Sequence, residues 1–261
     1  MTPRQRRRLL RGILYGVLTA GVVTLALVAD WPTIQRAFLQ PDIAADMFPD
    51  VITRAVKNTL LYTGLAFVFG FIIALVLALM KLSPVAPYRW IATVYIELLR
   101  GLPALVTLSV FAFGIPIAFG WRFPGGTLGT GSIGLAVVAA AYMAETIRAG
   151  IEAVPKGQRE AARSLGMSAP RAMATIILPQ AIRIVVPPLT NEIVLLIKDT
   201  ALLFVIGFSF AEKELFSFGR DIASDTFNST PFTVIAIMYL VITIPLTQLV
   251  AWMERRTKVA R

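Results

Sequence analysis

Six stretches of the chain consist almost wholly of apolar residues, and most polar residues lie between them. A helix of about 18 or more apolar residues is long enough to cross the roughly 30 Å of hydrocarbon in a bilayer. The pattern therefore predicts an all-α integral membrane protein with about six transmembrane helices. The predicted spans are residues 12–29, 58–80, 103–121, 130–149, 187–208 and 232–252.

The first apolar stretch follows the basic sequence RQRRRLLR and so has the layout of a secretory signal peptide. Its apolar core of 18 residues is longer than the core of such signals, about 7–15 residues. The following LVAD offers no small-x-small cleavage site. We therefore expect residues 1–30 to be a basic segment and an extra membrane anchor.

Charge is scarce and unevenly placed. Only 15% of the residues are charged, and the formal net charge is +10. With both termini in the cytoplasm, 18 of the 25 lysines and arginines fall in cytoplasmic segments and six in external loops. This excess predicts that orientation, because cytoplasmic loops of membrane proteins are rich in lysine and arginine. Topology explains the net charge, so no nucleic-acid partner is expected.

The chain has neither histidine nor cysteine, the usual ligands and bases of metal and catalytic sites. It also contains no G-x4-G-K-[ST] phosphate-binding loop. We therefore expect no metal, no cofactor and no enzymatic activity, so any ATP hydrolysis would belong to another chain.

Two segments between the predicted spans have helical patterns of their own. The sequence YRWIATVYIELLRGLP repeats polar residues at helical spacing, which is typical of a helix lying at the membrane surface in contact with lipid. Gly101 and Pro103 are expected to end it. Residues 150–183 contain GQREAARSLG, which predicts a short helix, a turn at Gly166 and a second helix capped by Ser168.

The surface of this helix is flat at Ala161 and Ala162, which suits close contact with a partner protein. An ordinary polar connector remains the alternative. Residues 160–179 also fit the pattern E-A-A-x3-G-x9-I-x-L-P and thereby resemble the cytoplasmic coupling loop of ATP-binding-cassette importer permeases. The matching residues are Glu160, Ala161, Ala162, Gly166, Ile176, Leu178 and Pro179. The resemblance implies a type I importer permease fold in which this loop docks into a dimer of ATP-binding subunits.

Three longer stretches resemble the permeases of the polar amino acid branch of this family. They are YIELLRGLP (95–103), AYMAETIRAGIEAVPKGQREAARSLGMS (141–168) and LPQAIRIVVPPLTNEIVLLIKDTAL (178–202). The resemblance covers about residues 50–255 and implies a bacterial cytoplasmic-membrane permease. It further implies a second permease subunit, the same or homologous, and an external solute-binding protein. The chain departs from the branch in its extra segment 1–30, in RGLP for RGTP and in KDTAL for KDTSL.

Several charged or polar residues lie inside the predicted spans, where an unpaired charge is unfavourable by at least about 2.5–3.5 kcal/mol. Glu145, Arg148, Asn191 and Lys198 are candidates to line a substrate path, with carboxylate and cation facing the two charges of an amino acid. The alternative is that Glu145 and Lys198 only form ion pairs that hold the bundle together. For Glu192 and Asp199 we favour that second role.

A different class of protein also fits the intramembrane charges. A secondary transporter driven by an ion gradient would carry such residues without needing an ATPase. Many such carriers contain internal repeats, and none is evident here. Pro187, Pro188 and Pro245 fall in the last two predicted spans, where prolines act as hinges or as fixed kinks.

Overall fold

The computed structural model describes residues 3–259, and every regular element in that range is helical. The α-helices are α1 (Pro3–Val28), α2 (Trp31–Phe38), α3 (Pro41–Asp46), α4 (Lys57–Leu82), α5 (Ala86–Gly101), α6 (Ala104–Ser109), α7 (Ile115–Phe119), α8 (Gly126–Glu152), α9 (Lys156–Ser164), α10 (Ala169–Ala172), α11 (Leu178–Asp199), α12 (Leu215–Thr226) and α13 (Thr230–Val259). Short π-helical stretches are η1 (Val51–Val56), η2 (Val110–Gly114) and η3 (Met173–Ile177), and η4 (Thr200–Ile206) and η5 (Phe210–Glu212) are 3-10 helices.

Among the described residues, four helical segments are long and apolar enough to cross a membrane. They are Leu10–Val28, Val51–Leu82, Gly126–Glu152 and Thr230–Arg256. A fifth span results if α5 and the helical run Ala104–Phe119, which meet at 106°, are counted as one broken span. This criterion, which rests on length and composition alone, does not count a sixth span. The expected span 187–208 instead belongs to α11, which starts at Leu178, carries Arg183 and Lys198, and ends at Asp199.

The centre of the bundle is the contact between α4 and α8. Tyr62 and Ala74 of α4 and Leu135 and Met143 of α8 belong to one buried apolar cluster. Small residues let the two backbones approach closely, as is usual between membrane helices. A Cβ atom at Gly70, for example, would lie 3.1 Å from the carbonyl oxygen of Ala136. Helices α5 and α11 pack around this pair.

Helix α5 confirms the helix expected from the pattern of residues 88–100, and its end at Gly101 is also confirmed. It buries Ala92, Ile96 and Leu99 and contacts both α4 and α8. Its opposite face exposes large apolar side chains, among them Trp90 and Val94. The helix is therefore part of the bundle, with a second apolar face available to lipid or to a partner.

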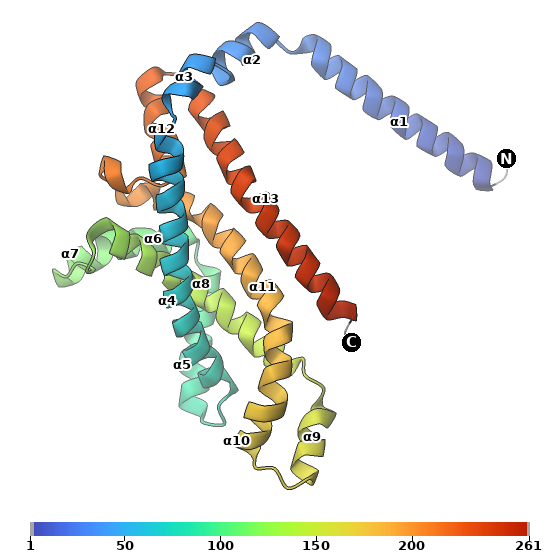
Figure 1. Cartoon of the computed structure of the whole chain (residues 1–261), viewed down its shortest axis with the longest axis vertical. Helices are drawn as coiled ribbons and strands as arrows, with labels where there is room; N and C mark the ends of the chain where they lie inside the picture. The colour runs from blue at the N-terminus through green and yellow to red at the C-terminus, as the bar shows by residue number, and fades with distance from the viewer. Residues whose placement is uncertain (1–2, 260–261) are drawn as a thin grey trace.

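The segment between α1 and α4, on the external side of the predicted topology, is folded onto the rest of the chain and is not a solvated loop. The backbone N–H of Ser229 donates to the carbonyl oxygen of Ala37 at 2.9 Å, and Thr230 Oγ1 accepts from the N–H of Gln40 at 3.0 Å. Met47 and Val51 pack in one buried cluster with residues of α12 and α13. Helices α2 and α3 are thus attached to the α12–α13 end of the bundle (Figure 1).

Helix α12 begins at a buried carboxylate. Glu214 accepts hydrogen bonds from the N–H groups of Phe216 and Ser217, at 2.6 and 2.7 Å, and so caps the helix. Burial raises the pKa of Glu214 above its ordinary value, although these hydrogen bonds lower it in part. The hydroxyl group of Tyr239 on α13 also donates to Glu214, at 3.4 Å, so the same carboxylate links α12 to α13.

Helix α1 confirms a long apolar helix near the N-terminus, but its apolar stretch is not buried against the rest of the chain at all. It slants away from the other helices in Figure 1. Residues 1 and 2 of the predicted anchor, and Arg261 of the basic tail, lie outside the described residues. Within α11 and α13 the prolines 187, 188 and 245 do not end the helices.

Candidate functional site

The segment 150–183 folds as a helix, a glycine turn and a second helical stretch, as the sequence predicts, but Ser168 at the start of the second helix forms no capping hydrogen bond with its side chain. Helix α9 ends at Ser164 with Leu165 as its C-cap, and Gly166 takes the left-handed conformation with φ +82°. The N–H of Met167 donates to the carbonyl oxygen of Ala162 at 3.1 Å, and the N–H of Gly166 to that of Arg163 at 3.0 Å. This pair of hydrogen bonds is a Schellman motif, for which glycine is preferred because it has no Cβ atom.

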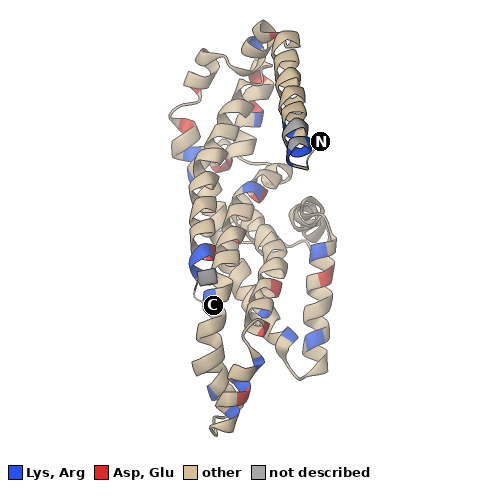
Figure 2. Ribbon diagram, turned by 90° about the vertical axis from the view of Figure 1, so that its right-hand side faces the viewer, with Lys and Arg blue, Asp and Glu red and all other residues tan. Residues whose placement is uncertain are grey.

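The α9–α10 segment projects from one end of the bundle (Figure 1). The ribbon in Figure 2 carries several basic residues near this tip, while the long helices are mostly uncharged along their middle stretches. Helix α9 exposes Glu160 and Ala161, and Leu165 at its end is 84% exposed. A large apolar side chain at the tip of a polar helix is suited to a pocket on another protein.

The other residues of the pattern have different surroundings. Ala162 is only 4% exposed, because α9 packs there against η3, so it stabilises the segment from inside instead of widening the exposed face. Ile176 is half-buried, while Leu178 and Pro179 begin α11 with exposed side chains. The pattern thus contains both residues that hold the turn and residues that are free to meet a partner.

A cavity of about 380 Å³ lies at the base of this segment, between the end of α8, the start of α9 and η3. It is lined by Ile151, Glu152, Val154, Pro155, Lys156, Arg159 and Ile177. Helix α9 is therefore not closely packed against α8, and its orientation depends on the Pro155 turn and on η3.

A cluster of four charged side chains lies beside that base, at the C-terminal ends of α4 and α8. Glu145 binds Lys81 of α4 through one carboxylate oxygen and Arg148 through the other, with Arg148 Nη2 at 2.8 Å. Arg148 also pairs with Glu152. The cluster joins α4 to α8, so the geometry favours the ion-pair role of Glu145 and Arg148 over direct contact with substrate.

Lys81 and Glu152 were not among the sequence candidates. The spacing of Glu145, Arg148 and Glu152 at three and four residues places them on one helical face, so Glu152 was detectable from the sequence. Lys81 follows the predicted span 58–80, and only the packing of α4 on α8 brings it to Glu145.

Asn191 and Lys198 lie elsewhere. Both are exposed on α11, and Lys198 is in its last turn, whereas Glu145 is near the opposite end of the bundle. In residues 3–259 no hydrogen bond or ion pair connects either of them to the Glu145 cluster. The four substrate-path candidates therefore do not form one site within a single chain. No group of three or more Asp and Glu residues in the described part of the chain is arranged to hold a metal ion.

Comparison with known proteins supports this description. Residues 66–259 match the family model for the binding-protein-dependent transport system inner membrane component. The chain is 39% identical, over 76% of its length and 89% of the relative's, to the "Probable glutamine ABC transporter permease protein GlnM" of Bacillus subtilis (strain 168). It is 33% identical, over 79% and 92%, to the "Arginine transport system permease protein ArtQ" of the same organism.

A solved structure described as an amino acid ABC transporter with histidines matches with a TM-score of 0.74 and 39% identity. That match covers 81% of this chain and 96% of the other. The family model begins at residue 66, so α1 lies outside its match. On these grounds, the chain belongs to the family of binding-protein-dependent transport system inner membrane components.

Proposed function

We propose that this chain is the permease subunit of an ATP-driven importer of polar amino acids in the bacterial cytoplasmic membrane. Family membership and the relatives named for glutamine and arginine support the proposal. These two amino acids share an α-ammonium and an α-carboxylate group, but their side chains differ in charge. The proposal is therefore for the class of substrate and not for one amino acid.

The observation that carries the proposal is the projecting α9–α10 segment. Its tip combines a rigid glycine turn, a polar helix and the exposed Leu165. In the proposed mechanism this segment docks into a cleft of a separate ATP-binding subunit. Closure of the ATPase dimer then moves α9, and η3 transmits the movement to α11, which follows it without a break.

The complete transporter would contain further chains. A second permease subunit, the same or homologous, would provide the other wall of the translocation path and could place the exposed Asn191 and Lys198 against substrate. An external solute-binding protein would deliver the substrate to the α2–α3 and α12 end. The termini and the α9–α10 segment would then face the cytoplasm, where 18 of the 25 basic residues fall.

Reconstituted transport tests this function. The complex that co-purifies with the chain would be placed in liposomes, its solute-binding protein added outside, and uptake of radiolabelled glutamine, arginine and leucine measured with ATP or a non-hydrolysable analogue inside. Uptake of a polar amino acid that requires hydrolysable ATP is the expected result.

A secondary transporter gives a different result in the same experiment. Uptake would then follow an imposed proton or sodium gradient and would not depend on ATP. That outcome would replace the importer proposal with the ion-coupled alternative.

A further inference from the structure

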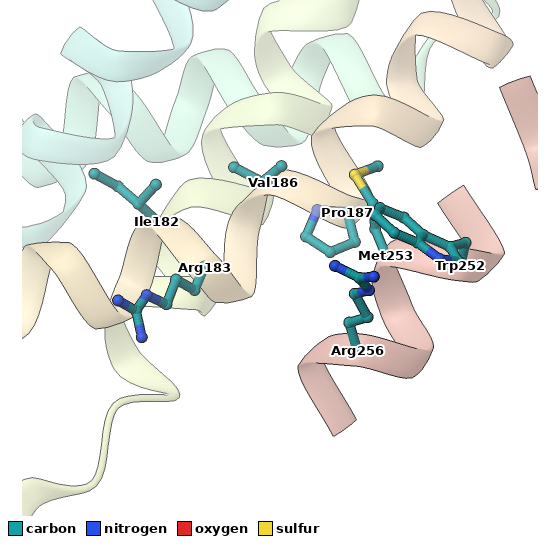
Figure 3. Close-up of a pocket in the computed structure, with 7 residues that line it drawn as sticks. All are labelled: Ile182, Arg183, Val186, Pro187, Trp252, Met253 and Arg256. Atoms are coloured by element: carbon teal, nitrogen blue, oxygen red, sulfur yellow. The ribbon is translucent and has the colours of Figure 1, made fainter. Parts of the chain in front are cut away.

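A groove of about 390 Å³ runs between α11 and α13 and is separate from the α9–α10 segment and from the Glu145 cluster. Figure 3 shows its lining side chains: Ile182, Arg183, Val186 and Pro187 come from α11, and Trp252, Met253 and Arg256 come from α13. Neither the family match nor the proposed transport cycle gives this groove a role.

The groove combines an apolar wall with one arginine from each of its two helices. Ile182, Val186 and Trp252 form apolar surface, and Val186 is 42% exposed. The guanidinium carbon of Arg256 lies 4.0 Å from the centre of the Trp252 ring, so a cation is held over the aromatic side chain. No carboxylate lines the groove, which leaves Arg183 and Arg256 as its charged groups.

The position of the groove matches the surface layer of a membrane. Arg256 is the last residue of the apolar segment Thr230–Arg256, and Trp252 lies one turn before it. Tryptophan is enriched at headgroup depth, and arginine at a helix end extends toward the headgroups. Arg183 lies in the second turn of α11, at the same end of the bundle as the α9–α10 segment. In the proposed orientation this is the cytoplasmic leaflet.

We propose that the groove binds one anionic phospholipid. An acyl chain lies along Ile182, Val186 and Trp252, and the phosphate is bound by Arg256, with Arg183 as a second positive charge on the other helix of the groove. The occupant is a lipid and not a soluble anion, because most of the lining is apolar and its mouth opens at the side of two helices. A zwitterionic lipid fits less well, because two cations with no carboxylate beside them favour a net negative headgroup.

Quenching of Trp252 tests the proposal directly, because this side chain is part of the lining. Replacing Trp31, Trp90 and Trp121 by Phe leaves Trp252 as the single tryptophan. The full-length protein in detergent micelles would be titrated with phosphatidylglycerol or phosphatidylcholine carrying brominated acyl chains. We expect half-maximal quenching at about ten-fold lower mole fraction of phosphatidylglycerol.

Matched variants separate the headgroup contacts from general charge. Arg183→Gln with Arg256→Gln should bring the phosphatidylglycerol midpoint to that of phosphatidylcholine. Arg171→Gln with Arg255→Gln removes the same charge from exposed positions outside the groove and should leave the preference intact. Val186→Phe, which fills the groove without changing charge, should weaken quenching by both lipids.

Three results would overturn the proposal. The first is half-maximal quenching at the same mole fraction of both lipids in the single-tryptophan protein with its arginines unchanged. The second is an equal loss of preference in the two arginine pairs. The third is no quenching by either lipid, which would mean that α1 or a second copy of the chain covers the groove.

Discussion

The role expected for Glu145 from the sequence differs from the role that its contacts in the structure favour. In the sequence it is a carboxylate inside a predicted span, suited to an ammonium group of substrate. In the structure both carboxylate oxygens are occupied by cations of the same chain, Lys81 and Arg148. Its side chain is 17% exposed, so little of it is left for a ligand.

Glu145→Gln should therefore destabilise the chain without weakening substrate binding. Loss of the charge leaves Lys81 and Arg148 without their shared partner, and we expect a decrease in stability of about 1–3 kcal/mol. The matched control is Glu152→Gln, which loses one ion pair on a half-exposed side chain and should have a smaller effect, below about 1 kcal/mol. Thermal unfolding in detergent measures both. A raised KM for uptake with unchanged unfolding would instead place Glu145 in the substrate path.

Asp221 on α12 gives a pH-dependent prediction. Burial raises the pKa of Asp221, but hydrogen bonds from Lys213 and Arg220 outweigh this effect, so the pKa lies below its ordinary value. Because the pKa of Asp221 is lower in the folded chain than in the unfolded chain, ionised Asp221 stabilises the fold at pH values above its unfolded-state pKa. This stabilisation is lost as the pH falls through its folded-state pKa.

Asp221→Asn should remove this part of the acid sensitivity and, at neutral pH, destabilise the chain by no more than about 1 kcal/mol, because the pair is partly exposed. Asp225→Asn, one turn further on, removes a charge that has no ion pair in the described residues and is the control. Unfolding temperatures between pH 3 and pH 7 distinguish them. Equal curves for the two variants would show that the Lys213–Asp221 pair does not contribute.

At the scale of elements, the packing of α8 on α11 depends on a glycine. A Cβ atom at Gly150 would lie 1.9 Å from Val185 Cγ2 of α11, and the nearest backbone atom would be 3.7 Å away. The obstacle is therefore one methyl group of one side chain. Helix α11 follows the α9–α10 segment and η3 along the chain, so in the proposed mechanism movement of α9 would be passed to α8 at this contact.

Gly150→Ala should destabilise the chain by about 1–3 kcal/mol through overpacking. Val185→Ala removes the obstructing methyl group, so the double variant should be more stable than the sum of the two single changes predicts, by at least about 1 kcal/mol. Gly64→Ala, where a Cβ atom meets nothing within 4 Å, is the control and should not be destabilising. Additive effects of Gly150→Ala and Val185→Ala would contradict the contact.

The elements also show what could be predicted from the sequence. Apolar length predicted α4, α8 and α13, and local propensity with Gly166 predicted the α9 turn, because these features depend on neighbouring residues only. The bounds of the span 187–208 differ from those of α11 because α11 begins nine residues earlier, in a less apolar stretch that packs on three other helices. The ordered α2–α3 segment was missed for the same reason, since its hydrogen bonds go to residues near Ser229, far along the chain.

At the scale of the whole molecule, α1 stands apart. None of the residues of its apolar stretch is buried, so we expect the bundle from α4 to α13 not to depend on it. Deletion of residues 2–28 should leave the unfolding temperature of the solubilised chain unchanged within about 2 °C. A large decrease would mean that α1 packs on its own chain. An unchanged temperature with loss of permease dimer would place its contacts on another subunit.

The central claim is that the α9 turn connects this chain to a separate ATPase. The most direct test is affinity purification of the C-terminally tagged chain from native membranes, with wild type, Gly166→Val and Gly157→Val. Both glycines have open space around the position of a Cβ atom, but only Gly166 has a positive φ, which a β-branched residue does not tolerate.

We predict that an ATP-binding subunit co-purifies with wild type and Gly157→Val and is lost with Gly166→Val. Equal recovery with Gly166→Val would contradict the role of the turn. A folded wild-type chain that recovers no ATPase would contradict the importer itself.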